Sequence, residues 1–244
     1  MPMEEKRCVM ILLAAGSGSR MKSGTAKQFM LLGDKPLIWY SLNTVEKSPV
    51  IDECILVTAE KDIDHMRRGI VEKYGFHKVS VIVPGGSERW ESVANAVQTL
   101  ENRGMVKKGY IFIHDGARPF LTEEVLERVY LEVKEHPACV AAVLSKDTVR
   151  LADENGFAKS TPDRRGVWII QTPQAFEAGL LIRAYTELRG RADRLGKENI
   201  TVTDDAGVVE LFAEQRIRLV EGSYDNIKVT TPGDMKIAEA FLEA

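Results

Sequence analysis

Short apolar runs that alternate with amphipathic segments are the feature that most constrains the fold of this chain. The runs are continuously apolar, which is typical of parallel strands buried on both faces. Segments with helical periodicity separate them, and this order predicts an α/β fold with a mostly parallel sheet and helices on both faces. The predicted strands cover residues 7–14, 53–58, 78–83, 109–114, 138–144 and 216–221. The predicted helices cover residues 36–47, 60–74, 88–103, 123–136, 175–189, 204–214 and 233–243.

One polar segment, residues 146–170, interrupts this alternation. Its centre, residues 153–156 (DENG), has the composition of a hairpin turn between extended segments at 147–152 and 157–161. Because a two-stranded ribbon is only marginally stable alone, we expect this arm to protrude and to pack on a second copy of the chain. The sequence therefore predicts a single domain over residues 1–244, with 146–170 as an inserted dimerisation arm of a homodimer.

Charge and cysteine content argue against several classes of protein. The 33 basic and 36 acidic residues give a net charge of −3, so neither nucleic acid nor a membrane is expected as a partner. The apolar run near the N-terminus, residues 8–16, is too short to span a bilayer. Cys8, Cys54 and Cys139 lie far apart in apolar runs, which predicts buried thiols and neither a disulfide framework nor a zinc site. Reduced thiols are expected of a cytoplasmic protein.

A glycine-rich loop, residues 12–21, directly follows the first predicted strand. Its small residues allow a ligand to approach the backbone, where successive N–H groups can hold phosphate oxygens. Two basic residues, Arg20 and Lys27, suit a triphosphate there, and a tight connection with solvent-facing side chains is the alternative. Met21 breaks the dinucleotide-binding pattern, and the chain contains no Gly-Lys-Ser/Thr sequence of an ATPase phosphate loop.

Three further loops follow predicted strands and should lie at the same edge of the sheet. Asp115 ends the fourth strand, where a carboxylate is a candidate Mg²⁺ ligand, with a capping aspartate as the alternative. Residues 84–89 (PGGSER) can hold a nucleobase through backbone groups, with Ser92 one turn into the next helix. Residues 224–230 (YDNIKVT) place an acid and a base three residues apart, and a surface ion pair is the alternative interpretation.

The motifs, taken in order, resemble those of the 2-C-methyl-D-erythritol 4-phosphate cytidylyltransferases of the non-mevalonate isoprenoid pathway. They extend over nearly the whole chain and read AAGSGSRM, GGSERWESV, HDGARP, DRRGVW, TPQAF, TDDA and DNIKVT. HDGARP and DNIKVT are the most specific of them. The ribitol 5-phosphate cytidylyltransferases are similar, so ribitol phosphate is the alternative acceptor. The resemblance implies a Rossmann-like sheet of the nucleotide-diphospho-sugar transferase type and an enzyme that uses CTP, Mg²⁺ and a polyol phosphate.

The resemblance also implies roles for individual residues. The implied catalytic cations are Arg20, Lys27, Arg164 and Lys228. The implied nucleotide-binding residues are Ala14, Ala15, Gly16, Gly18, Gly86, Ser87, Ser92, Asp115 and Arg118. The implied acceptor-binding residues are Thr148, Arg164, Thr172, Thr203, Asp225 and Lys228, of which those on or beside the arm would serve the other subunit. The implied metal ligands are Asp115 and Asp225.

The implied reaction is attack of the acceptor phosphate on the α-phosphorus of CTP, with loss of pyrophosphate. A phosphate oxygen is already anionic near neutral pH and needs little help from a general base, so we expect His114 to be structural. Three other classes compete: an NAD(P)-dependent oxidoreductase with Glu60 on the ribose, a nucleotide-sensing module, and a glycosyltransferase that uses Asp204 and Asp205 as metal ligands. For those two aspartates, a role at a helix N-terminus is the simpler interpretation.

Overall fold

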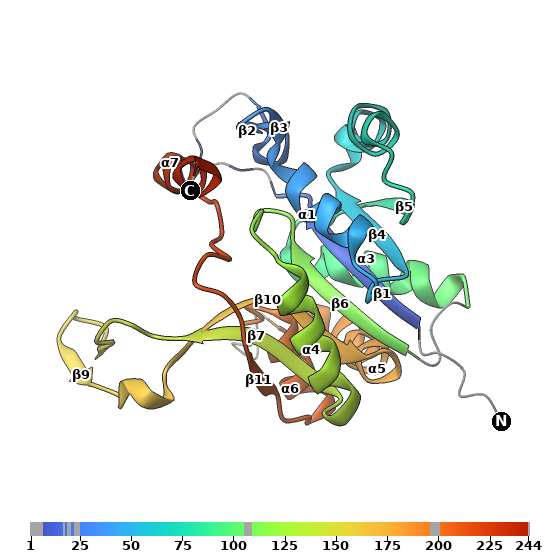
Figure 1. The fold of residues 1–244 in the computed structure, drawn as a ribbon. Coiled ribbons are helices and arrows are strands. Elements are labelled where there is room, and N and C mark those ends of the chain that lie inside the picture. The colour runs from blue at the N-terminus through green and yellow to red at the C-terminus, as the bar shows by residue number, and fades with distance from the viewer. Residues whose placement is uncertain are drawn as a thin grey trace.

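The computed structural model describes residues 7–16, 18, 21, 25–104, 109–195 and 201–243. Within these ranges the centre of the fold is a seven-stranded sheet of order β11-β7-β10-β6-β1-β4-β5 (Figure 1). All of its pairings are parallel except the two made by β10. The strands are β1 (Arg7–Ala14), β4 (Glu53–Thr58), β5 (Val79–Pro84), β6 (Gly109–Asp115), β7 (Ala138–Leu144), β10 (Trp168–Glu177) and β11 (Arg218–Glu221).

Helices cover both faces of this sheet, and each face has its own apolar core. Successive residues of a strand point to opposite faces, so in β1 Met10 belongs to one core and Ile11 to the other. On one face lie α1 (Leu37–Lys47), α4 (Glu123–Glu135) and the segment with α2 (Ile63–His65). On the other lie α3 (Arg89–Asn102), α5 (Ala178–Gly190) and α6 (Asp205–Ala213). The predicted α/β class is confirmed.

The parallel register brings several loops to one edge of the sheet. β1 lies between β6 and β4, with Leu13 opposite Asp115 and Ala14 opposite Thr58. Thr58 in turn lies opposite Pro84 at the end of β5. The glycine-rich loop, the loop after β5 and the loop after β6 therefore leave the sheet side by side, as the sequence predicted.

The long strand β10 is absent from the predicted elements. It runs antiparallel between β6 and β7, in the middle of the sheet, and its register with β7 shifts between Ile170 and Gln174. The prediction of a helix from residue 175 is wrong at its start, because residues 175–177 complete β10 and α5 begins at Ala178. The four polar or proline residues at 171–174 give the strand no apolar pattern that sequence analysis could recognise.

Several short elements complete the described chain. The predicted helix over 60–74 consists of 3₁₀, α and π turns in succession, namely η3 (Glu60–Asp62), α2 and the π-helical η4 (Met66–Glu72). The sequence did not predict the small hairpin β2–β3 or the 3₁₀ turns. These are η2 (Lys27–Phe29), β2 (Leu31–Leu32), β3 (Lys35–Pro36), η5 (Arg164–Gly166) and η6 (Ala192–Arg194).

The last helix, α7 (Pro232–Glu243), packs on this hairpin and not on the main sheet (Figure 1). Met235 and Ala238 of α7 share a third, small core with Leu32 and Leu37. Val229, just before α7, belongs to the same core, so the segment between β11 and α7 is held near the glycine-rich loop. No helix within the described ranges is long and apolar enough to cross a membrane.

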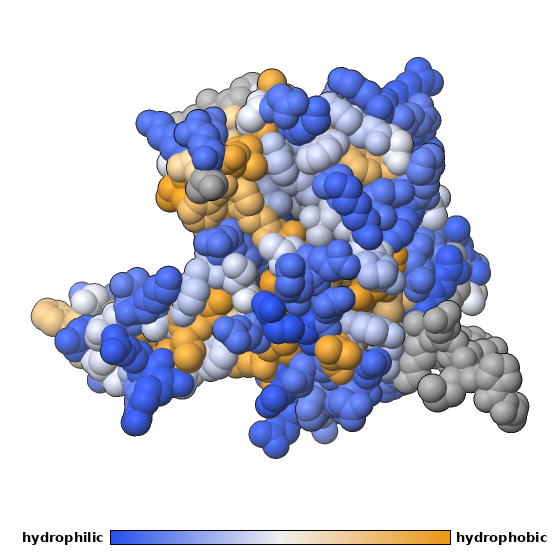
Figure 2. Space-filling model, viewed as in Figure 1, coloured by the Kyte–Doolittle hydropathy of each residue, from blue (hydrophilic) through white to orange (hydrophobic). Residues whose placement is uncertain are grey.

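The polar segment forms the predicted hairpin. Its strands, β8 (Leu151–Ala152) and β9 (Ala158–Ser160), pair antiparallel and project from the body of the molecule (Figure 1). Apolar side chains on and beside this arm are exposed, including Leu151, Ile169 and Phe157, the last with 73% of its surface accessible. Figure 2 shows such apolar surface on the arm among hydrophilic residues. Its role in dimerisation stays a prediction.

Candidate active site

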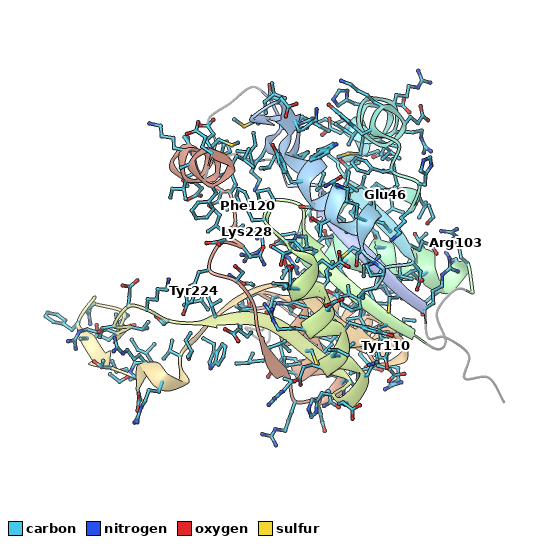
Figure 3. The ribbon with its side chains drawn as sticks, viewed as in Figure 1. Glu46, Arg103, Tyr110, Phe120, Tyr224 and Lys228 are labelled. Carbon is cyan, nitrogen blue, oxygen red and sulfur yellow. The ribbon has the colours of Figure 1, made fainter. Side chains whose placement is uncertain are left out.

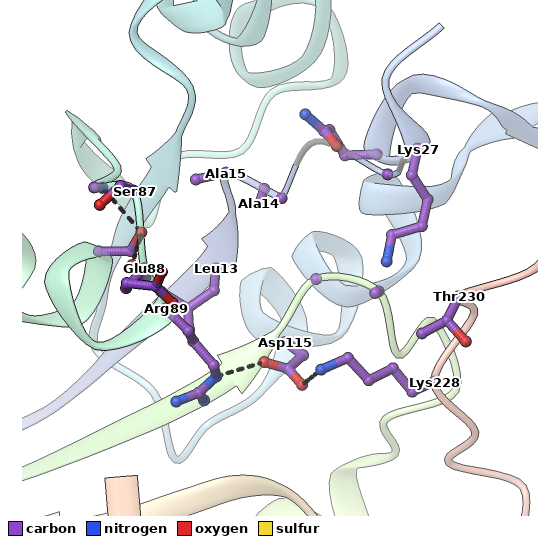
Figure 4. A pocket seen from close by; sticks show the side chains of 17 residues that line it. Leu13, Ala14, Ala15, Lys27, Ser87, Glu88, Arg89, Asp115, Lys228 and Thr230 are labelled. Carbon is purple, nitrogen blue, oxygen red and sulfur yellow. Dashed lines mark hydrogen bonds and ion pairs between the residues drawn. The ribbon is translucent and has the colours of Figure 1, made fainter. Parts of the chain in front are cut away.

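A pocket of about 490 Å³ lies beyond the carboxyl ends of the parallel strands, the edge at which α/β sheets usually bind ligands. Its walls come from the loop after β1 with η2, the start of α3, the loop after β6 and the segment between β11 and α7 (Figure 4). It is lined by Leu13, Ala14, Ala15, Gly16, Gly18, Lys27, Gln28, Gly86, Ser87, Glu88, Arg89, Ser92, Asp115, Gly116, Ala117, Lys228 and Thr230.

The loop after β1 contributes small residues and one lysine. Its predicted phosphate-binding residues all line the pocket: Ala14, Ala15, Gly16 and Gly18. Gly18 has a φ of +64°, and a Cβ at this position would lie 3.0 Å from Lys27 Cβ, so glycine allows the loop to pass close to η2. Figure 4 shows the Lys27 side chain extending into the pocket. Arg20, the other predicted cation of this loop, lies outside the described residues.

The start of α3 forms a second wall with little freedom to move. Glu88 and Glu91 make reciprocal capping bonds with the first helical turn. The Gly86 N–H donates to Ser92 Oγ at 3.0 Å, and Ser87 Oγ donates to Glu91 Oε2 at 2.5 Å. A Cβ at Gly86 would lie 2.2 Å from Glu91 Cβ, so only glycine fits this turn. The residues predicted to contact the base, Gly86, Ser87 and Ser92, therefore lie together on one wall.

Asp115, at the end of β6, forms the floor of the pocket and is the centre of its charges. Lys228 Nζ lies 2.7 Å from Oδ2, Arg89 Nε lies 3.4 Å from Oδ1, and Arg118 Nε lies 3.9 Å from Oδ2. Burial opposes ionisation of this carboxyl, but the three cations outweigh burial and hold the pKa of Asp115 below its ordinary value. Asp115 is therefore a carboxylate at neutral pH.

His114 and Thr172 support Asp115 from beneath. Thr172 Oγ1 accepts from the Asp115 N–H at 3.1 Å and donates to His114 Nδ1 at 2.9 Å, while His114 Nε2 donates to the Arg118 carbonyl at 3.2 Å. A carbonyl only accepts, which assigns this tautomer. Burial lowers the pKa of His114 to about 4, so the imidazole is neutral. His114 has the structural place expected of it, and the Thr172 hydroxyl is engaged below the pocket floor.

Arg118 lies behind Asp115 and is not among the residues that line the pocket. Its Nη1 donates to the Asn226 carbonyl at 2.7 Å, and Asn226 Nδ2 donates to the Thr172 carbonyl at 2.8 Å. These bonds tie the segment that carries Lys228 to β10 and to the end of β6. A contact of Arg118 with the nucleotide stays a prediction.

Five of the six predicted acceptor-binding residues do not line this pocket in the described part of the chain, and one of them, Thr172, is the residue already placed below the pocket floor. Thr148 and Arg164 are exposed on the arm, which projects away from the body. Thr203 and Asp225 are exposed on the loops before α6 and after β11. Of the predicted acceptor-binding set only Lys228 lines the pocket, and the other assignments stay predictions.

Sequence analysis gave no individual role to five pocket residues, although four of them lie in loops that it singled out: Leu13, Gln28, Glu88, Arg89 and Thr230. Arg89 is the most consequential, because it forms ion pairs with two carboxylates, Asp115 and Asp205. A signal for it was present, since Arg89 follows Gly86 by three residues and lies at the start of a predicted helix at the edge of the sheet where ligands bind.

The donor set fits a divalent cation that arrives with a nucleotide. Mg²⁺ in such sites takes one or two carboxylates and completes its shell with phosphate oxygens and water. Asp115 can supply one carboxylate at the pocket floor, whereas Asp225 does not line the pocket. Among the described residues there is no cluster of three or more histidine, cysteine or acidic side chains that could hold a metal alone.

Comparisons with known proteins agree with this geometry. A family model described as 2-C-methyl-D-erythritol 4-phosphate cytidylyltransferase matches residues 8–244. Proteins of that name are 44% identical over 95% of this chain and 94% of their own in Lachnoclostridium phytofermentans, and 44% identical over 96% and 98% in Lachnospira eligens. The crystal structure of 4-diphosphocytidyl-2C-methyl-D-erythritol synthase from Anaerococcus prevotii aligns with a TM-score of 0.81 at 31% identity, covering 98% of this chain and 97% of that one.

The family match spans nearly the whole chain, and the relatives have almost the same length. The resemblance that the motifs carried is confirmed. This chain belongs to the 2-C-methyl-D-erythritol 4-phosphate cytidylyltransferase family.

Proposed function

We propose that this protein transfers the cytidylyl group of CTP to 2-C-methyl-D-erythritol 4-phosphate. An oxygen of the acceptor phosphate attacks the α-phosphorus, a new P–O bond forms, and the bond to the β-phosphate breaks to release pyrophosphate. The observation that carries the proposal is a pocket lined by Lys27, Arg89 and Lys228, the last two in ion pairs with Asp115, in a chain of this family.

The reaction must bring two anionic substrates together. Two unit charges about 4 Å apart repel each other by about 4 kcal/mol at an effective dielectric constant of 20. Lys27, in η2, and Lys228, in the segment between β11 and α7, both line the pocket, and their ammonium groups can offset this repulsion. Catalysis then consists mainly of positioning and charge stabilisation.

Different walls of the pocket are placed to bind the two substrates. The small residues of the loop after β1 leave backbone N–H groups for the triphosphate, and the start of α3 offers backbone and hydroxyl groups to the cytosine. Lys228, which reaches Asp115 from the segment before α7, is placed to hold the acceptor phosphate. When bound, Mg²⁺ at Asp115 would neutralise charge that develops on the phosphates.

The choice of acceptor follows the family. Eight relatives at 38–44% identity are named for methylerythritol phosphate. We therefore favour methylerythritol phosphate, with ribitol 5-phosphate as the comparison substrate in any assay.

The arm suggests the quaternary structure. Its exposed apolar residues and the exposed Arg164 support a homodimer in which Arg164 and Thr148 serve the acceptor site of the partner. Cys8, Cys54 and Cys139 are buried thiols, which supports a cytoplasmic location.

One assay tests the proposed reaction. Pyrophosphate release is measured with CTP and Mg²⁺ in the presence of methylerythritol phosphate, of ribitol 5-phosphate, or of no acceptor. We expect release only with an acceptor and a kcat/KM at least about a hundredfold higher for methylerythritol phosphate. Equal rates with ribitol phosphate would contradict the substrate assignment, and CTP binding without any release would identify a nucleotide-sensing module.

A further inference from the structure

The function proposed above gives no separate task to Arg89 or to Asp205 of the TDDA motif, yet these two residues meet beside Asp115 at the pocket floor. Arg89 is the first residue of α3, and its guanidinium bridges two carboxylates. Its Nη2 lies 2.7 Å from Asp205 Oδ2, and its Nε lies 3.4 Å from Asp115 Oδ1. The two acids come from β6 and from the start of α6, so Arg89 joins three elements at one point.

Asp205 is a rigid anchor for this arginine. It is completely buried, and Tyr185, also completely buried, donates its hydroxyl to Asp205 Oδ1 at 2.6 Å. The neighbouring Asp204 caps α6 by accepting from the Gly207 N–H at 2.9 Å, which fixes the backbone beside Asp205. Because Asp205 cannot move away, the guanidinium is held at the end opposite Asp115.

The two oxygens of Asp115 consequently have unlike partners. Oδ1 faces Arg89, whose position the buried Asp205 determines. Oδ2 faces Lys228, whose flexible side chain is 39% exposed and comes from the segment between β11 and α7. A cation that enters the pocket can displace Lys228 from Oδ2 far more easily than it can displace Arg89 from Oδ1.

We propose that Arg89 is a positioning residue that, anchored by Asp205 and Tyr185, occupies Oδ1 of Asp115 and leaves only Oδ2 for a divalent cation. Lys228 is then the group that the cation replaces, which frees its ammonium for the acceptor phosphate. This inference rests on the proposed function for the chemistry that Asp115 serves. It also gives the TDDA motif a role in the active site besides that of beginning a helix.

The test measures Mn²⁺ binding to the ligand-free protein by electron paramagnetic resonance of the unbound ion. Arg89→Gln removes the competing positive charge, so the affinity of the protein for Mn²⁺ should rise about tenfold. Asp205→Asn releases Arg89 to pair with Asp115 alone, so the affinity should fall about tenfold. Both variants should lower kcat, because the orientation of Asp115 is lost in each.

Arg103→Gln is the matched control. Arg103 also pairs with a buried carboxylate, Glu53, at 3.1 Å, but it lies far from Lys228 (Figure 3). We expect its Mn²⁺ affinity to equal that of the wild type. Should Asp205→Asn fail to fold, as judged by thermal unfolding, Tyr185→Phe loosens the same anchor and should lower the affinity by a smaller factor.

The opposite directions of the two shifts decide the result. A merely structural role would lower Mn²⁺ affinity in both Arg89→Gln and Asp205→Asn, or change neither, and either result would overturn the proposal. The proposed function has its own test, and it is wrong if the wild-type protein releases no pyrophosphate with either polyol phosphate. The Mn²⁺ measurement is independent of that test, because it needs neither CTP nor an acceptor.

Discussion

Individual side chains in the pocket divide into those that meet the substrates and those that hold them in place. Lys27 and Lys228 line the pocket, whereas His114, Thr172 and Arg118 make hydrogen bonds behind Asp115. This division leads to two predictions, one about turnover and one about stability.

Lys27→Ala should lower kcat by about a hundredfold or more, because its ammonium stabilises charge that develops in the transition state. The measurement is steady-state pyrophosphate release at saturating CTP and Mg²⁺. Lys35→Ala serves as the control, since Lys35 is paired with the exposed Asp34 outside the pocket and its loss should leave kcat unchanged. An unchanged kcat for Lys27→Ala would remove this residue from the catalytic set.

His114→Gln should reduce the dependence of stability on pH. The buried imidazole takes up a proton only near pH 4, whereas in the unfolded chain it does so near pH 6.5, so the wild type loses stability as pH falls through that window. From pH 7 to pH 4.5 this loss is roughly 2 kcal/mol. Asp115 acts in a more acidic range. Its lowered pKa stabilises the folded protein above pH 3.8, and this contribution is lost as the pH falls below that value.

Urea unfolding of both proteins at pH 7 and pH 4.5 provides the comparison. The variant should be less stable than the wild type at pH 7, because Thr172 loses its partner, but it should lose less between the two pH values. Equal losses in the two proteins would show that His114 does not titrate in this range.

Among the secondary-structure elements, the strand ends do most to shape the site. Continuous apolar runs predicted β1, β4, β5, β6, β7 and β11, and the parallel order predicted which loops would meet. The same reasoning missed β10, whose residues 171–174 are buried but not apolar. Gln171 Nε2 donates to the Ser223 carbonyl at 2.7 Å, and Gln174 Nε2 donates to Asp204 Oδ2 at 2.9 Å.

These partners are distant in sequence, so no local pattern could predict that the polar centre of β10 is satisfied inside the sheet. Arg89 escaped assignment for the same reason, since its partner Asp205 lies 116 positions further along the chain. Motif spacing predicted the pocket-lining glycines, serines, Asp115 and the two lysines. Roles that depend on contacts between distant segments could be recognised only in the folded structure.

Gly86→Ala should raise the KM for CTP by about tenfold or more, because the new Cβ would collide with Glu91 and shift the first turn of α3. The same change should appear as a Kd for CTP raised about tenfold or more, which titration calorimetry with CTP alone measures. Gly190→Ala is the matched control, since a Cβ at Gly190 meets nothing within 4 Å at the end of α5. Wild-type affinity in Gly86→Ala would show that this wall does not hold the base.

For the molecule as a whole, the arm is the part whose exposed apolar residues find no partner surface within the described part of a single chain. Phe157→Ser should convert a dimer into a monomer, because exposed apolar residues of the arm then lose their largest contact. Sedimentation velocity at micromolar concentration distinguishes the two states. Leu131→Ser, which changes another exposed apolar residue on α4, should remain dimeric, and a monomeric wild type would contradict the dimer proposal.

The small core that Met235 and Ala238 share with Leu32 and Val229 has a consequence for biosynthesis. Lys228 and Thr230 belong to a pocket whose other walls are all made by residues 13–117, so most of the cradle emerges from the ribosome early. We therefore expect the nascent chain to be inactive until residues 228–238 follow and the small core holds the segment that carries Lys228. Turnover is then expected to begin only once this C-terminal segment has been made.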